Sequence, residues 1–104
     1  MSINVGRWDR RDNADLVALG DAAFAYCRAV KAYQDGVVNS RFFWVTPDRI
    51  VVQTEFDSPE AQNRAPKAET TKAMFALSDL ARAVDTERWM HPATGQAVYR
   101  QAER

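Results

Sequence analysis

The sequence predicts an α+β fold in the order strand–helix–strand–strand–helix–strand, with two helices on one face of an antiparallel sheet. Three observations predict it. Residues 37–60 contain two β-rich runs joined by a tight turn and followed at once by a helix start. A long helical pattern precedes this segment, and a second follows it. The 104 residues are enough for one domain, which we expect to span the whole chain.

Residues 3–8 form a short apolar-rich run and are predicted to be the first strand. The first helix should begin at Asp12 or Asn13, either of which suits an N-cap, and run to about Gln34. Gly36 suits the left-handed turn that ends it. The predicted buried stripe consists of Leu16, Leu19, Ala23, Tyr26, Val30 and Tyr33, widened by Phe24 and Cys27.

The next two strands are predicted at residues 37–45 and 50–56, since both runs are rich in β-branched and aromatic residues. Residues 46–49 form the turn between them. Pro47 presets the backbone at the second turn position, and Asp48 suits the third. The sequence therefore predicts a β-hairpin here.

Ser58 is a suitable cap for a helix whose first residue is Pro59. We expect residues 63–66 to interrupt this helix, and a second segment to run over residues 66–84. Residues 86–91 are the predicted last strand. Residues 92–95 read as a turn, and residues 97–100 as a further short strand or a tail lying on a neighbouring molecule.

Composition excludes several classes of function. Lysine plus arginine and aspartate plus glutamate each total 14, so the chain lacks the basic excess of a nucleic-acid binder. No apolar run is long enough to span a membrane or to serve as a signal peptide, and we expect a cytoplasmic protein. One cysteine and one histidine are too few for a metal site, so no metal or cofactor is expected. Cys27 is interpreted as a buried core residue.

The hairpin also predicts a partner. We expect Val45 to pair with Ile50 and Phe43 with Val52, and alternation along each strand then sorts the side chains by face. Monomers seldom expose an apolar patch larger than ~600 Å², so we expect the face away from the helices to pack on a second copy of the chain. The alternative is a monomer with a semi-polar open face. The predicted interface residues are Val38, Phe42, Trp44, Val51, Gln53 and Glu55.

Three segments carry a resemblance to a known group of proteins. They are residues 35–38 entering the second strand, residues 51–56 as the third strand, and residues 58–61 starting the next helix. With them, nearly the whole chain resembles the dimeric α/β-barrel superfamily with ferredoxin-like subunits. This group includes antibiotic-biosynthesis monooxygenases, stress-responsive barrel proteins, haem-degrading monooxygenases and small isomerases.

The resemblance implies a ligand cavity between sheet and helices in each subunit. In the monooxygenase branch it implies oxidation of phenolic or quinol-like substrates without metal or flavin. The haem-degrading branch uses a strand-one asparagine, which Asn4 matches, with a tryptophan and a histidine on the second helical region. Residues 58–84 contain neither tryptophan nor histidine, so haem degradation is not indicated. The histidine–aspartate dyad of the small isomerases also lacks support, because His91 is the only histidine.

Candidate site residues follow from polarity at positions predicted to face the helices. Asn39 and Arg41 would be costly to bury without partners, and a histidine titrates in the range useful for acid–base work. The catalytic candidates are therefore Asn39, Arg41 and His91. The candidates for binding an aromatic ligand are Tyr26, Tyr33, Phe43 and Trp89.

Two functions stay open from sequence. One is a homodimer that binds a small apolar or aromatic ligand between sheet and helices without catalysis. The other is a cofactor-independent monooxygenase acting on a phenolic or quinol-like substrate. Whether the chain is an enzyme is therefore left undecided, and neither nucleic acid nor a membrane is an expected partner.

Overall fold

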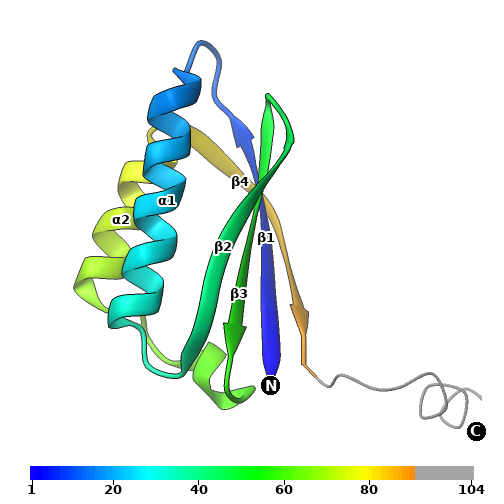
Figure 1. The fold of residues 1–104 in the computed structure, drawn as a ribbon, viewed down its shortest axis with the longest axis vertical. Helices are drawn as coiled ribbons and strands as arrows, with labels where there is room; N and C mark the ends of the chain where they lie inside the picture. The colour runs from blue at the N-terminus through cyan, green and yellow to red at the C-terminus, as the bar shows by residue number, and fades with distance from the viewer. Residues whose placement is uncertain (91–104) are drawn as a thin grey trace, which may run out of the picture.

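The computed structural model describes residues 1–90, which form two layers (Figure 1). The strands make one antiparallel sheet in the order β2-β3-β1-β4, and both helices lie against one face of it. This arrangement confirms the predicted ferredoxin-like subunit. The elements are β1 (Ser2–Arg10), α1 (Leu16–Tyr33), β2 (Val37–Thr46), β3 (Arg49–Phe56), the 3₁₀ helix η1 (Glu60–Asn63), α2 (Ala68–Ser78) and β4 (Ala81–Trp89).

The core lies between α1, α2 and the helix-facing side of the sheet. Leu19, Ile50 and Leu77 are fully buried in it, one each from α1, β3 and α2. Such close-packed apolar contact is the main stabilising term of a domain of this size. Cys27 is also buried, as predicted. Of the predicted stripe on α1, Leu19, Ala23, Cys27 and Val30 are buried, whereas Leu16, Phe24 and Tyr33 are exposed.

α1 begins later than predicted. Asp15 is the N-cap, and its carboxylate accepts a hydrogen bond from the backbone N–H of Ala18 at 2.8 Å. The predicted caps at positions 12 and 13 are wrong because Asn13 adopts a positive φ of 63° in the loop before the helix. The other end is as predicted, with Gly36 at φ 79° directly before β2.

The hairpin turn is confirmed, but its register differs from the prediction by one residue on β2. Ile50 lies opposite Trp44, and Val52 lies opposite Phe42. Val45 is an extra residue beside the turn, a β-bulge, and one extra residue reverses the face of the β2 residues that precede it. Phe42 and Trp44 therefore lie on the helix side of the sheet, where Phe42 packs against the core.

The second helical region also needs a correction. Ser58 accepts a hydrogen bond from the Ala61 N–H, as predicted for a cap, and η1 then ends at Asn63. However, α2 ends at Ser78, and residues 81–84 belong to β4 instead of the predicted helix. Pairing of β4 with β1 begins at Ala81, opposite Arg10, so tertiary pairing overrides the local helical pattern. The predictions for residues 92–95 and 97–100 lie outside the described residues.

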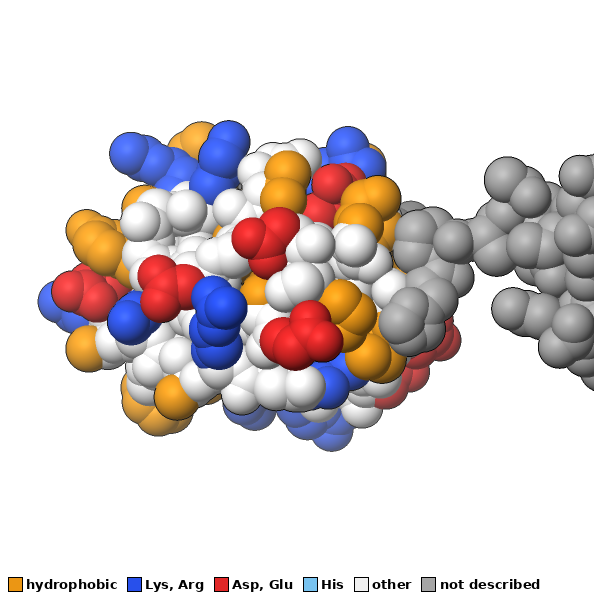
Figure 2. Space-filling view, turned by 90° about the horizontal axis from the view of Figure 1, so that it is seen from below, with side chains coloured by type: hydrophobic (Ala, Val, Ile, Leu, Met, Phe, Trp, Pro, Cys, Tyr) orange, Lys and Arg blue, Asp and Glu red, His pale blue; other side chains and the backbone are white. Residues whose placement is uncertain are grey.

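The surface carries charges of both signs close together, as the zero net charge suggests. Figure 2 shows this at the end of the molecule that holds the loop before β2 and η1, where hydrophobic side chains form only small separate patches. In the described part of the chain, neither helix has the length and apolar character needed to cross a bilayer. Residues 1–90 contain no cluster of three or more His, Cys, Asp or Glu side chains that could hold a metal ion.

Two glycines allow a matched test of the fold. An added Cβ at Gly36 would lie 2.6 Å from the Cβ of Ala61, at a φ that disfavours other residues. We expect Gly36→Ala to lower the free energy of unfolding by at least ~1–2 kcal/mol. Gly20 lies in the second turn of α1, where an added Cβ meets Trp44 at an ordinary 3.6 Å, so Gly20→Ala should raise the free energy of unfolding by up to ~1 kcal/mol. Urea unfolding of both variants measures the difference. Equal effects of the two substitutions would contradict the turn geometry.

Candidate functional site

The layer between sheet and helices contains buried polar groups on its β1 and η1 side. Within residues 1–90, four buried side-chain atoms have no hydrogen-bond partner: Asn4 Oδ1, Gln62 Nε2, Gln62 Oε1 and Thr70 Oγ1. Buried polar atoms in native proteins are nearly always bonded to protein, water or ligand. We call Asn4, Gln62 and Thr70 the interior polar cluster.

Strand pairing, together with the position of η1 and of the first turn of α2, places these residues toward one end of the layer. Asn4 on β1 lies between Thr54 of β3 and Arg88 of β4, all three on the helix side. The Arg88 guanidinium donates to Asn63 Oδ1 at 2.8 Å, and Asn63 is the neighbour of Gln62 in η1. Figure 1 shows η1 and the start of α2, the turn that holds Thr70, at this same end.

The cluster offers hydrogen-bonding groups to water or a ligand, but its side chains have little capacity for acid–base chemistry. Its four unpaired atoms comprise an amide donor, two amide acceptors and a hydroxyl that can do either. Such a set matches phenolic hydroxyl and quinone carbonyl groups. Arg88, bound to Asn63 next to Gln62, brings a positive charge to this end of the layer.

Sequence reasoning singled out only Asn4 of these residues. Thr70 could have been found, because it falls on the buried stripe of α2 with Met74 and Leu77 at helical spacing. Gln62 gives no such signal, since η1 is too short to show a periodicity. Arg88 lies on the helix side of the sheet, and its guanidinium donates to Asn63 Oδ1.

The predicted catalytic residues are not brought together with this cluster. The corrected register places Asn39 opposite Glu55 and Arg41 opposite Gln53, on the face away from the helices. Arg41 is exposed, stacks over the Phe43 ring at 5.3 Å and donates to Gln53 Oε1 at 2.9 Å, so its expected burial is wrong. His91 lies outside the described residues.

The predicted ligand-binding residues are also dispersed. Tyr26 is mostly buried on α1 and meets Trp8 edge-on, with ring centroids 6.4 Å apart. Burial raises the pKa of its hydroxyl. Tyr33 is exposed at the end of α1, while Phe43 and Trp89 lie on the face away from the helices. Tyr26 alone among the four lies between sheet and helix.

We call the sheet surface that faces away from the helices the open face. Of the predicted interface residues, Val51, Gln53 and Glu55 lie on it. Phe42 and Trp44 lie on the opposite side, and Val38 is an exposed extra residue at a second bulge. The open face therefore carries Phe43 and Trp89 in place of Phe42 and Trp44, and it also carries ion pairs. These include Arg7 with Asp85 at 3.1 Å and Arg7 with Glu87 at 3.5 Å.

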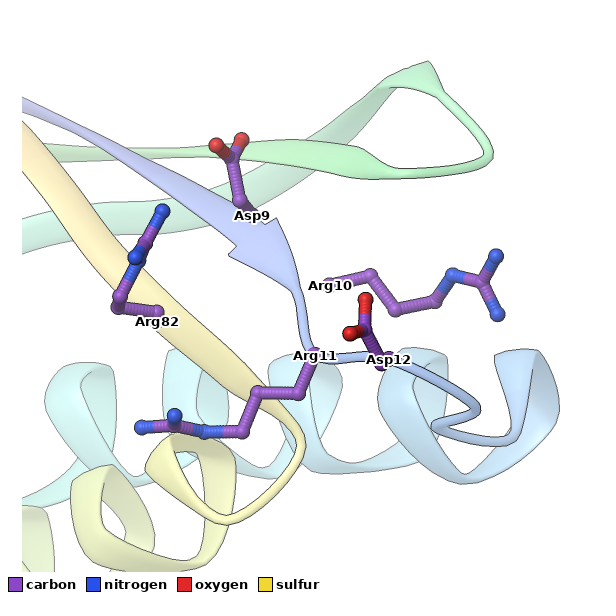
Figure 3. Close-up of a pocket in the computed structure, with 5 residues that line it drawn as sticks. All are labelled: Asp9, Arg10, Arg11, Asp12 and Arg82. Atoms are coloured by element: carbon purple, nitrogen blue, oxygen red, sulfur yellow. The ribbon is translucent and has the colours of Figure 1, made fainter.

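A polar hollow of about 240 Å³ lies at the end of β1 (Figure 3). Asp9 and Arg82 point to one side of it, while Arg10 and Arg11 extend in opposite directions. Its residues bind mainly protein groups. The Arg49 guanidinium donates two hydrogen bonds to the Asp9 carboxylate, at 2.6 and 3.1 Å. Arg10 donates to the Asp48 carboxylate and to the Ala14 carbonyl. Arg11 donates to the Ser78 carbonyl. We interpret the hollow as a structural junction, in which hydrogen bonds and ion pairs connect the ends of strands to the ends of helices.

The fold of the chain matches that of known structures, although its sequence matches no known family. No curated protein matches the chain in sequence either. The same arrangement of a four-stranded sheet and two helices occurs in solved structures, several of which are assigned to the antibiotic biosynthesis monooxygenases.

Three of these structures show the extent of the likeness. SnoaB, a cofactor-independent oxygenase from Streptomyces nogalater, matches with a TM-score of 0.72 and 18% identity over 90% of this chain and 95% of its own. Rv0793 from Mycobacterium tuberculosis matches with a TM-score of 0.70 and 15% identity, covering 90% and 97%. A Deinococcus radiodurans protein assigned to the antibiotic biosynthesis monooxygenases gives 0.70 and 15%, covering 90% and 95%. At these identities the likeness shows the fold alone.

The junction at Asp9 gives a pH-dependent test of stability. The hydrogen bonds from Arg49 lower the pKa of Asp9 below its ordinary 3.8. A lowered folded-state pKa stabilises the protein above the ordinary value, and this contribution disappears as pH falls through the lowered one. We therefore expect Asp9→Asn to unfold at lower urea concentration than the native chain at pH 7, with the difference shrinking as pH falls below 3.8 and vanishing in acid below the lowered pKa.

Asp12→Asn is the control, since Asp12 forms no ion pair within residues 1–90. Its unfolding midpoint should stay close to that of the native chain at both pH values. A midpoint difference for Asp9→Asn that persists unchanged into acid would show that the substitution acts through packing and not through the Arg49 pair.

Proposed function

We propose that this chain is a homodimeric protein that binds a phenolic or quinol-like ligand between sheet and helices. The observation that carries the proposal is the interior polar cluster, with four buried polar atoms that have no partner within residues 1–90. Leaving such groups unsatisfied costs ~1–3 kcal/mol each. A ligand with hydroxyl and carbonyl groups, or ordered water in its absence, removes that cost.

The second candidate function is cofactor-independent oxygenation, and the fold match to SnoaB favours it. In this reaction a substrate carbanion reacts with O₂, so that a CH₂ group becomes C=O and the second oxygen atom leaves as water. The protein would bind the oxygen substituents of the substrate through Asn4, Gln62 and Thr70. Arg88 would favour the ionised substrate through its charge.

The homodimer is supported by the fold class and by the open face. Ile3, Val51, Phe43 and Trp89 keep apolar surface accessible there, although ion pairs lie among them. A stable interface needs on the order of 1,600 Å² of buried surface in total. One face of a four-stranded sheet packed on its copy is the natural source of such an area.

Ligand binding is tested with two matched asparagine variants. Anthrone and 1,4-naphthohydroquinone should raise the melting temperature of the native chain. Asn4→Ala should lose most of this shift, because it removes an acceptor of the cluster, whereas Asn39→Ala should keep it. Oxygen uptake with the same two compounds then decides between binding and oxygenation.

The two variants also separate this site from the site expected from sequence. If Asn39→Ala abolishes the melting shift and Asn4→Ala preserves it, the ligand binds near Asn39 on β2 and the interior polar cluster is not the binding site. If neither compound shifts the melting temperature, the cluster binds ordered water only.

The dimer is tested with two matched valine variants. Val51→Lys places a charge on the open face, and we expect it to shift the mass measured by light scattering from twice the chain mass of 11.8 kDa toward a single chain. Val17→Lys is the control, since Val17 is 72% exposed on α1, and it should remain dimeric. A native chain that is monomeric at micromolar concentration would contradict the proposed assembly.

A further inference from the structure

A second pocket lies between α1 and the outer edge of the sheet. It has a volume of about 360 Å³ and is lined by Phe24, Cys27, Arg28 and Lys31 of α1 and by residues 39–42 of β2. We call it the edge groove. In the sheet order β2-β3-β1-β4, it lies at β2, two strands away from the Asn4 of the interior polar cluster. The proposed function does not use it.

The inner part of the edge groove is apolar. Phe42 is partly buried against the core, and Cys27 is 5% exposed. Burial raises the pKa of the Cys27 thiol, an effect that the Ser40 hydroxyl beside it only partly opposes. The thiol therefore stays neutral near pH 7 and contributes an apolar, polarisable surface. Phe24, more than half exposed, forms the outer wall.

The rim of the edge groove is basic. Arg28 and Lys31 lie one turn apart on α1, and the Arg28 guanidinium sits 5.7 Å from the centroid of the Phe24 ring. Within the described chain, neither cation has a carboxylate within the 4.0 Å of an ion pair. Four other basic residues, Arg7, Arg10, Arg49 and Lys67, do form such pairs. The rim is therefore complementary to an anion.

We propose that the edge groove binds a small aromatic carboxylate, with its ring between Phe24 and Phe42 and its carboxylate at Arg28 and Lys31. The volume is at the lower end of the ~300–1,000 Å³ typical of small-molecule sites, which limits the ligand to one or two rings. A guanidinium offers a carboxylate two parallel hydrogen bonds, and its stacking on Phe24 holds it in place.

An added β-strand is the less suitable occupant, although β2 is an edge strand. The β2–β3 register shifts twice, between Val37 and Asn39 and between Trp44 and Thr46. Bulges of this kind interrupt the regular row of backbone groups that an incoming strand needs.

The probe for the test is 2-naphthoate, titrated into the ¹⁵N-labelled full chain and followed by NMR. We expect saturable shifts of the amides of residues 24–31 and 39–42. The neutral alcohol 2-naphthylmethanol has the same ring system without the charge and should bind about tenfold more weakly, because it forms no charge-assisted hydrogen bonds.

Two double variants of equal net charge provide the comparison. Arg28→Gln with Lys31→Gln should weaken 2-naphthoate binding about tenfold or more. Arg64→Gln with Lys72→Gln removes the same two charge types outside the edge groove and should bind like the native chain. Phe24→Ala tests the apolar wall separately and should weaken the binding of both 2-naphthoate and 2-naphthylmethanol.

Three results would overturn the proposal. The first is equal affinity of the two double variants, which would show that the rim cations do not hold the ligand. The second is equal affinity for the carboxylate and the alcohol. The third is a set of shifted amides around Asn4, Gln62 and Thr70 instead of the edge groove, which would show that the probe enters the interior polar cluster.

Discussion

The extra residue Val45 shifts the alternation of side chains along β2 and thereby decides which of them face the helices. This bulge places Phe42 and Trp44 against the helix layer and leaves Phe43 and Arg41 on the open face. A strand without it would present each of these side chains to the other side. The wall of the edge groove and the chemistry of the open face are therefore both consequences of one inserted residue.

Local signals in the sequence were sufficient for the order of elements, the hairpin turn, the Ser58 cap and the left-handed Gly36. They could not reveal the bulge, because Val45 is as suitable for a regular strand as for an irregular one. The start of β4 was missed for a related reason. Residues 81–84 fit a helix locally, and only pairing with β1 makes them a strand. The candidate site could not be predicted in full, because the four residues of η1 are too few to show a periodicity that would mark Gln62 as buried.

The open face differs from the apolar surface that the sequence suggested, and this changes how a dimer would form there. Two ion pairs on this face form within one chain: Arg7 with Asp85, and Arg49 with Asp9. Burying charges that are already paired costs less than burying them alone, but it adds little affinity. In the proposed dimer, the apolar residues Val51, Ile3 and Phe43 would supply affinity. The ion pairs would instead select the partner and its orientation.

The chemistry of the interior polar cluster limits what reaction the proposed site could support. Amide and hydroxyl groups such as those of Asn4, Gln62 and Thr70 neither gain nor lose a proton near neutral pH. A reaction that relied on these three side chains would have to begin from a substrate acidic enough to ionise by itself, with Arg88 favouring the anion. Anthrones and quinols meet that condition, whereas unactivated hydrocarbons do not. The same groups would bind a non-reacting phenol equally well, so the acidity of the ligand, more than the residues around it, separates a binding protein from an oxygenase on this fold.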